Sequence, residues 1–156
     1  MTTGPKTFLY KRSLFSTHLP VDYRYTRSHQ WAKSLEDGKL RFGYTQFGTR
    51  MLGEVVDYNF ETSSQAAVQP GHVLGWVEGF KAVSELICNA RGIFAGANPA
   101  LRDDTELISR TPYTEGWLYE IMGELDEETL DVQDYVKHLD ITIESLLEQN
   151  KTDPRQ

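Results

Sequence analysis

The fold is decided by the stretch Glu78-Gly79-Phe80-Lys81-Ala82-Val83-Ser84. Residues 72–77 before it and residues 83–88 after it are short, mostly apolar runs that are typical of strands. Together they predict a two-stranded hairpin with a lysine at its tip. Although Lys81 lies between apolar runs, the turn forces its side chain outward. A modifying enzyme can find an exposed amine on a rigid turn, and a cofactor bonded to that amine can swing.

Three further motifs accompany the lysine stretch, in a fixed order along residues 23–121. They are Tyr25-Thr26-Arg27-Ser28-His29-Gln30-Trp31, Leu52-Gly53-Glu54-Val55-Val56 and Pro112-Tyr113-Thr114-Glu115-Gly116-Trp117-Leu118. The set resembles the glycine cleavage system H protein family, with its Tyr-x-x-x-His-Glu-Trp, Leu-Gly-(Asp/Glu)-Val-Val, Glu-Ser-x-Lys-Ala and Pro-Tyr-x-x-Gly-Trp motifs. Gly71 and Gly92 also match the spacing of the family glycines on either side of the lysine. The resemblance implies a carrier protein with lipoic acid amide-linked to Lys81.

Lys81 has two competing interpretations. Taken alone, a turn lysine is a solvated side chain, and only the flanking motifs favour a modified one. Biotinyl domains share the lysine hairpin, but their lysine lies between two methionines, whereas Phe80 and Ala82 flank Lys81 here. The Lys-Ala pair therefore favours lipoate. The resemblance implies that a lipoate-protein ligase or lipoyl transferase attaches the cofactor and recognises Glu78. Alternatively, Glu78 is only a solvated residue at the end of a strand.

The resemblance implies a mostly β fold of the lipoyl/biotinyl hammerhead type, a flattened sandwich of two antiparallel sheets. Short strands at regular spacing support this fold independently. Thr45 can cap a short helix over residues 45–52, which Gly53 would end. Asp131 can cap a second helix over residues 132–149, where apolar side chains recur at helical spacing.

The chain is interpreted as one carrier domain over residues 23–150, between two terminal segments. Residues 1–22 are predicted to form an N-terminal arm that packs four apolar side chains on the domain, namely Phe8, Leu9, Leu14 and Phe15. The basic, Ser/Thr-containing composition of this arm weakly resembles a transit peptide, but its prolines break any long amphipathic helix. Residues 151–156 are predicted to be frayed.

Composition argues against several classes of protein. With 156 residues, 39% of them hydrophobic, the chain can build one domain with a core. No apolar run approaches the ~18 residues of a membrane span, and a net charge of −7 argues against nucleic acid binding. One cysteine excludes an intrachain disulfide, and four scattered histidines lack zinc-ligand spacing, so we expect no metal. We expect a monomer in the cytoplasm, or in the mitochondrion of a eukaryotic host.

A cleft near the lysine is implied by the same resemblance. In glycine cleavage H proteins the loaded arm folds into a cleft, where its cationic amine meets carboxylates. One family glutamate falls on Gln30 and a second family acid falls on Glu85, so one of the two charges is lost. Ser28 and His29 beside Gln30 are further cleft candidates, and His29 is alternatively structural. Cys88 is either a small core residue or a thiol near the dithiolane.

Several departures from the family favour a different cargo. Neutral Gln30, Phe80 beside the lysine and the altered stretch after Val56 resemble the H-like lipoate-binding proteins of bacterial sulfur oxidation. The first prediction is therefore a carrier of sulfur intermediates for a heterodisulfide-reductase-like complex. The alternative is a glycine cleavage carrier that moves an aminomethyl group between glycine decarboxylase and aminomethyltransferase and serves lipoamide dehydrogenase. A third interpretation is an interaction module without a cofactor. None of the three makes the chain an enzyme.

Overall fold

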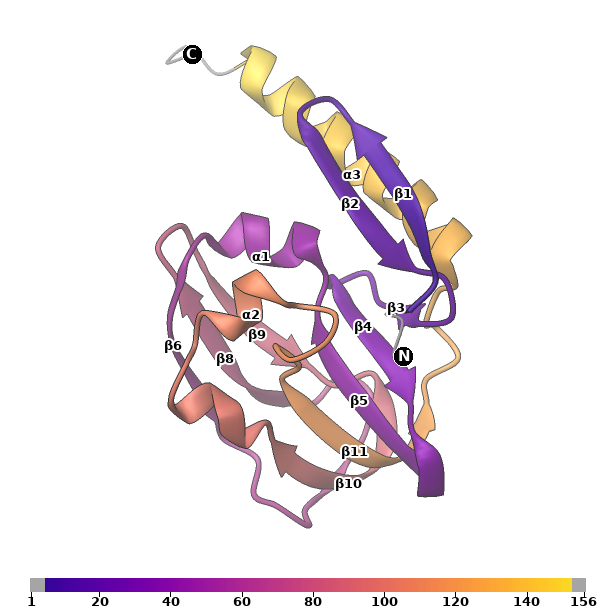
Figure 1. Cartoon of the computed structure of the whole chain (residues 1–156), viewed down its shortest axis with the longest axis vertical. Coiled ribbons are helices and arrows are strands. Elements are labelled where there is room, and N and C mark those ends of the chain that lie inside the picture. Colours follow the sequence, from indigo (N-terminus) through magenta and orange to yellow (C-terminus); the bar gives the residue numbers. More distant parts are fainter. Residues whose placement is uncertain (1–4, 153–156) are drawn as a thin grey trace.

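The computed structural model describes residues 5–152, which form three antiparallel sheets and a long C-terminal helix (Figure 1). The first sheet pairs β1 (Thr7–Arg12) with β2 (Phe15–Pro20). The second has the order β3 (Arg24–Tyr25), β4 (Gln30–Ser34), β5 (Lys39–Tyr44), β11 (Tyr119–Leu125), β10 (Ala90–Ala97) and β7 (Ala67–Val68). The third has the order β6 (Val55–Phe60), β8 (Val73–Gly79) and β9 (Val83–Ile87).

The six-stranded and three-stranded sheets enclose the larger of two hydrophobic cores. Buried side chains from both sheets meet there, including Phe42, Leu74, Val77, Leu86, Phe94 and Tyr119. The rings of Phe42 and Tyr119 stack with their centroids 4.9 Å apart. The predicted fold, mostly β with two packed antiparallel sheets, is confirmed.

Both predicted helices are confirmed. Helix α1 (Gln46–Leu52) is capped by the Thr45 hydroxyl, which accepts a hydrogen bond from Gly48 N, and it ends at Gly53 with a φ of 77°. Helix α3 (Val132–Thr152) begins after Asp131, whose carboxylate accepts from Asp134 N at 2.8 Å. The predicted frayed segment starts inside α3, and residues 153–156 lie outside the described part of the chain.

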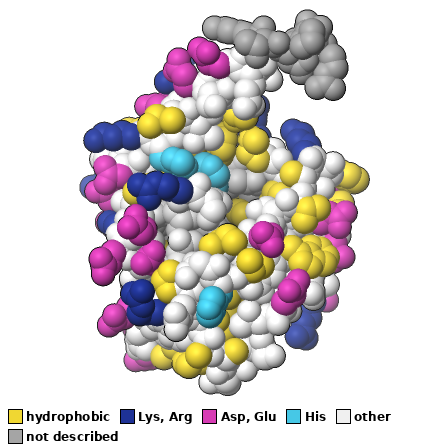
Figure 2. All heavy atoms as spheres, turned by 180° about the vertical axis from the view of Figure 1, so that it is seen from behind, with side chains coloured by type: hydrophobic (Ala, Val, Ile, Leu, Met, Phe, Trp, Pro, Cys, Tyr) yellow, Lys and Arg dark blue, Asp and Glu magenta, His cyan; other side chains and the backbone are white. Residues whose placement is uncertain are grey.

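Three short helical segments complete the secondary structure of residues 5–152. They are η1 (Glu36–Gly38), η2 (Pro99–Arg102) and α2 (Leu107–Arg110). The turn of α2 and the loop after it lie beside α1 (Figure 1). On the face seen from behind, charged side chains of both signs are interspersed, without a basic stripe (Figure 2).

The N-terminal segment forms a β-hairpin that lies along α3 (Figure 1). It builds a second core, in which Tyr10, Phe15 and Leu19 pack with residues of β3, β4 and α3. The Tyr10 hydroxyl donates to Asp140 at 2.7 Å, and Arg12 pairs with Asp140 and Glu144 on the same helix. The hairpin is thus joined to α3 by apolar packing and by ion pairs.

The set of apolar side chains that this hairpin buries differs from the prediction. Phe15 is buried as expected, but Leu9 and Leu14 are 57% and 92% exposed and Phe8 is 36% exposed. The prediction that these three pack on the domain is wrong. Strand alternation places Leu9 on the opposite face of β1 from buried Tyr10, and Leu14 lies in the turn. Phe8 shares the face of Tyr10 but lies near the start of the strand, where it stays partly exposed.

Replacing Leu19 with alanine is expected to lower the free energy of unfolding by about 2–4 kcal/mol, because it opens a cavity in the second core. The matched change Leu14→Ala is expected to cost less than about 0.5 kcal/mol, since that side chain is exposed. Urea unfolding followed by tryptophan fluorescence measures both. Equal losses in the two variants would contradict the packing described here.

Candidate functional site

The hairpin of β8 and β9 ends in a tight turn that carries Lys81. Gly79 N donates to Ala82 O at 2.8 Å, so Phe80 and Lys81 are the two residues at the tip. Both are exposed, and Phe80 is 75% exposed. No ion pair of the Lys81 amine is present within residues 5–152. The predicted lysine hairpin therefore forms, with its amine accessible.

The backbone of this turn is held by the connection between α1 and β6. Lys81 N donates to Leu52 O at 2.9 Å, and Phe80 N donates to Glu54 O at 3.0 Å. The approach depends on glycine: a Cβ on Gly79 would lie 2.1 Å from Leu52 O. The lysine backbone is thus fixed while its side chain remains free to move.

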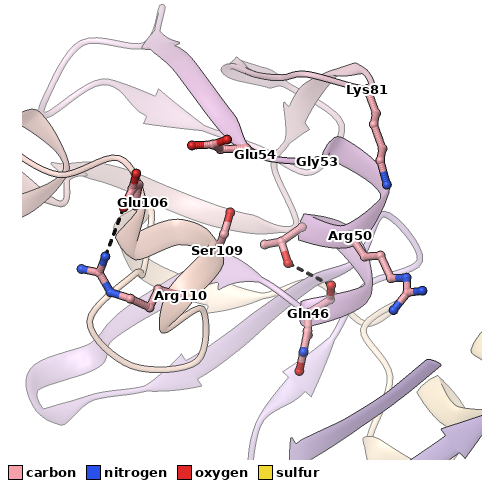
Figure 3. A pocket seen from close by; sticks show the side chains of 9 residues that line it. Gln46, Arg50, Gly53, Glu54, Lys81, Glu106, Ser109 and Arg110 are labelled. Carbon is pink, nitrogen blue, oxygen red and sulfur yellow. Dashed lines mark hydrogen bonds and ion pairs between the residues drawn. The ribbon is translucent and has the colours of Figure 1, made fainter. Parts of the chain in front are cut away.

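A hollow of about 650 Å³ opens beside Lys81, between α1 and α2 (Figure 3). Its lining residues are Gln46, Thr49, Arg50, Gly53, Glu54, Lys81, Glu106, Ser109 and Arg110. In the close-up, Glu54, Glu106 and Ser109 lie on one side, and the ends of Lys81 and Arg50 lie on the other (Figure 3). Arg110 pairs with Asp104 at 2.7 Å and with Glu106 at 3.4 Å, whereas Glu54 has no ion pair within the described residues.

These features fit a lipoyl group bonded to Lys81. Amide formation needs an accessible primary amine, and the exposed Lys81 side chain lies on a fixed turn without an ion pair to any described residue. The hollow beside it has the size of a small-molecule site. Gly53 lets the stem approach closely, because its φ of 77° suits glycine and a Cβ there would lie 3.0 Å from Lys81 Cγ.

The five predicted cleft residues do not line this hollow. Ser28 is exposed and contacts Thr26, with the two hydroxyl oxygens 3.0 Å apart. Glu85 is exposed on β9, where it faces Trp76 of β8 across the sheet. Cys88 is 1% exposed, and its thiol donates to Ala90 O at 3.1 Å. Burial raises the pKa of the Cys88 thiol, so the structure places it as a small core residue.

Gln30 is a core residue with both ends of its amide paired. Its Oε1 accepts from the Tyr119 hydroxyl at 2.5 Å, and its Nε2 donates to Ile87 O at 3.1 Å. The side chain is 1% exposed. A neutral amide satisfies these two buried partners, one donor and one acceptor, as a carboxylate cannot. The identity of residue 30 is therefore explained by packing and carries no information about the cargo.

His29 joins the body of the protein to α3. Its Nδ1 lies 2.8 Å from the Tyr135 hydroxyl, which in turn lies 2.8 Å from the Thr45 hydroxyl that caps α1. Its ring lies 4.7 Å from Phe47 and 5.3 Å from His138 between centroids. Burial, together with nearby His138, lowers the pKa of His29 from 6.5 to about 4.

This lowered pKa predicts a loss of stability in acid. Because the folded pKa lies below the unfolded one, protonation favours unfolding as the pH falls from about 6.5 to about 4. We expect His29 to account for a loss of roughly 2 kcal/mol between pH 6.5 and 4.5. Asparagine tolerates the φ of 66° at residue 29, so the His29→Asn variant should fold but lack the loss of stability that His29 causes in acid. Urea unfolding at several pH values measures it, with exposed His18→Asn as control; parallel profiles would contradict it.

The hollow residues Arg50, Glu54 and Ser109 are absent from the sequence prediction. Glu54 belongs to the Leu-Gly-Glu motif and directly follows the helix that ends at Gly53. This position is the sequence feature that could have indicated a role for Glu54 in the site. Arg50 on α1 and Ser109 on α2 have no such signal. They reach the site only because α1 and α2 lie side by side.

The described part of the chain contains neither a metal-binding cluster nor a membrane-spanning helix. Among residues 5–152, no group of three or more His, Cys, Asp or Glu side chains is placed to hold a metal ion. Over the same residues, no helix has both the length and the apolar character that crossing a membrane requires.

Comparison with known proteins agrees with this geometry. The family model described as glycine cleavage H-protein matches residues 23–142. The glycine cleavage system H protein of Chlorobium phaeobacteroides (strain BS1) is 36% identical over 123 residues, covering 77% of this chain and 96% of the relative. The glycine cleavage system H protein of Corynebacterium jeikeium (strain K411) is 36% identical over 119 residues, covering 71% of this chain and 92% of the relative.

A solved structure shows the same architecture. The crystal structure of a glycine cleavage system H protein from Mycobacterium marinum is similar with a TM-score of 0.69 and 32% identity. The match covers 76% of this chain and 97% of that one. The members of this family are non-catalytic carriers that work with partner enzymes and hold lipoate covalently on a lysine. This chain therefore belongs to the glycine cleavage H-protein family.

Proposed function

We propose that Lys81 bears the lipoyl group and that the loaded chain carries the aminomethyl group in glycine cleavage. Its partners would be glycine decarboxylase, aminomethyltransferase and lipoamide dehydrogenase, with a lipoate-protein ligase or lipoyl transferase attaching the cofactor. The observation that carries the proposal is the accessible amine of Lys81 on a turn held by Leu52 and Glu54, beside a hollow. The names of the relatives support the choice of pathway.

The residues around Lys81 have separate tasks. The backbone bonds to Leu52 and Glu54 present the amine at a fixed place. When bound, the lipoyl group supplies a dithiolane for disulfide exchange and group carriage. Glu54 offers the hollow a carboxylate without an ion pair in the described residues, and a cationic amine near it gains a countercharge. This charge supports an aminomethyl cargo.

The sulfur-oxidation interpretation loses its main argument. It depended on the neutral side chain of Gln30 in a cleft, and Gln30 is buried between Tyr119 and Ile87. The relatives found carry the name of the glycine cleavage protein, and none supports a heterodisulfide-reductase-like partner. Glycine cleavage is therefore the better supported cargo chemistry.

Domain limits and compartment complete the proposal. Residues 23–150 form the carrier domain, which the N-terminal segment supplements with a hairpin on α3. The cytoplasm is the proposed compartment, because the carrier cycle needs the dithiol form, which persists where thiols are kept reduced.

Glycine–bicarbonate exchange tests this function. The lipoylated chain, added to glycine decarboxylase, is expected to support exchange at a rate comparable to that of a glycine cleavage H protein. The unlipoylated chain is the control and should give background exchange. A fully lipoylated chain that supports no exchange would contradict the glycine cleavage assignment and would leave lipoate carriage intact.

A further inference from the structure

The N-terminal hairpin of β1 and β2 lies outside residues 23–142, the part of the chain that the family model matches. In β2, the side chains of Phe15 and Thr17 turn inward and are only 6% and 3% exposed. Both contact α1, the helix that forms one wall of the hollow beside Lys81. The hairpin therefore packs against a wall of the functional site, although it does not line the hollow itself.

An aromatic contact and a hydrogen bond fix α1 against the hairpin. The Phe15 ring meets the Phe47 ring edge-on, with the centroids 5.5 Å apart and the planes at 81°. The Thr17 hydroxyl donates to Gln46 Oε1 at 2.8 Å, and Gln46 N donates to the Tyr113 hydroxyl at 2.9 Å. Gln46 is itself a lining residue of the hollow. The first turn of α1 is thus tied to β2.

Arg50, one turn further along α1, supplies the positive charge of this wall. Its guanidinium carbon lies 5.6 Å from the centroid of the Phe15 ring, within the range of a cation–π contact. Among residues 5–152 Arg50 forms no ion pair, although Glu54 lines the same hollow. The ends of Arg50 and Glu54 lie on opposite sides of the hollow (Figure 3). The guanidinium therefore rests on the hairpin and leaves the carboxylate unpaired.

The position of Arg50 decides the charge that the hollow offers to a ligand. A guanidinium and a carboxylate that meet can pair through two parallel hydrogen bonds. For exposed groups, such a pair and a cation–π contact stabilise by similar amounts. A single aromatic ring is therefore enough to shift Arg50 from one partner to the other. If Glu54 were paired with Arg50, its charge would be neutralised and a cationic ligand would find no free countercharge there.

We propose that Phe15 is a positioning residue that sets the specificity of the hollow for cationic cargo. Its ring holds Arg50 away from Glu54 and so keeps this carboxylate free for the aminomethyl cation. The contacts between β2 and α1 support this role, because they keep the ring beside the guanidinium. The inference rests on the proposed function, since it requires that the lipoyl arm on Lys81 carries that cation.

The test measures how long the aminomethylated chain survives after glycine decarboxylase has loaded it and has been removed. Loss of the group consumes a water molecule: the C–S and C–N bonds break, and the free thiol, formaldehyde and an ammonium ion result. Ammonium release therefore gives the rate. Phe15→Leu keeps an apolar side chain without a ring, and we expect it to shorten the lifetime about threefold, the effect of one exposed cation–π contact. Glu54→Gln is expected to shorten it about tenfold, because a charged hydrogen-bond partner is lost.

A double variant separates the positioning of Arg50 from the folding of the hairpin. If the ring acts by holding the guanidinium, the ring has no further effect once the guanidinium is gone. Phe15→Leu combined with Arg50→Gln should therefore retain the aminomethyl group as long as Arg50→Gln alone. Leu19→Ala is the matched control for stability, because it opens the same core and leaves Phe15 unchanged. Its lifetime should equal that of the wild type.

A second measurement uses the unmodified chain and needs no cofactor. The NMR signal of the Arg50 side-chain Nε–H is expected upfield in the wild type, because the Phe15 ring shields it. In Phe15→Leu the signal should move downfield as the guanidinium pairs with Glu54. Adding Glu54→Gln to that variant should remove the downfield shift.

Two kinds of result would overturn the proposal, and they can be told apart. If the double variant loses the aminomethyl group as fast as Phe15→Leu, or if Phe15→Leu leaves the Arg50 signal in place, the ring does not hold the guanidinium. The proposed function then stands without this positioning role. If the wild-type chain takes up no lipoyl or aminomethyl group, the proposed function fails, and the specificity for cationic cargo fails with it even where the NMR signals respond as expected.

Discussion

Replacing Lys81 with arginine is expected to abolish lipoylation and, with it, all carrier activity. Arginine keeps the positive charge and nearly the length of the side chain, but its guanidinium stays protonated and forms no amide with an activated acyl group. The fold should be unaffected, because Lys81 is exposed and only its backbone is bonded to Leu52. The free energy of unfolding is expected to stay within about 0.5 kcal/mol of the wild type.

Intact mass after incubation with ligase, lipoate and ATP measures this result, and peptide mapping locates the modified residue. Lys11→Arg is the matched control, since Lys11 is an exposed lysine on β1. The control should be modified as fully as the wild type. A lipoyl mass shift that survives in Lys81→Arg would refute the attachment site.

The second large effect is expected from Gly79→Ala. A Cβ at this position would lie 2.1 Å from Leu52 O and 2.7 Å from Leu52 C, and both are backbone atoms that cannot rotate away. The hairpin tip must therefore move off the α1–β6 connection, which breaks the bonds from Lys81 N and Phe80 N. We expect the free energy of unfolding to fall by about 2–4 kcal/mol.

The same substitution should also lower the rate of lipoylation, because the lysine is no longer held in place. Gly71→Ala is the comparison: it has no atom within 4 Å of its Cβ position, and its φ of 94° should cost about 1–2 kcal/mol. Its lysine turn stays intact, so its lipoylation should match that of the wild type. If Gly79→Ala is as stable and as readily lipoylated as the wild type, the close approach to Leu52 does not hold the turn.

Local signals were sufficient for the lysine hairpin and for both helices. The turn at Lys81 follows from two short apolar strands around Glu78-Gly79-Phe80, and such a pattern depends on few residues far away. Helices α1 and α3 follow from the caps Thr45 and Asp131 and from apolar spacing. The ordered motifs around these elements are specific enough to indicate the family from the sequence alone.

The inward or outward direction of side chains could not be predicted where a strand has two covered faces. In β4, Trp31 enters the core shared with α3 and the N-terminal hairpin, while neighbouring Ala32 enters the core between the sheets. Gln30 lies on the same side as Ala32, and it is buried because a hydroxyl and a carbonyl pair with its amide. Simple alternation assumes that one face of a strand is exposed to water, but the first three residues of β4 are buried on both faces.

By itself, the sequence determined the family, the lysine turn and the two main helices, because each depends on neighbours along the chain. Only the tertiary structure decided which side chains surround that lysine. Arg50, Glu54 and Ser109 come from separate segments, and the hollow they line exists because α1, α2 and the hairpin tip pack together. The contact between the Phe15 ring and Arg50 likewise depends on the packing of the N-terminal hairpin against α1. Contacts of this kind depend on strand pairing and helix packing between distant segments, which local patterns do not specify.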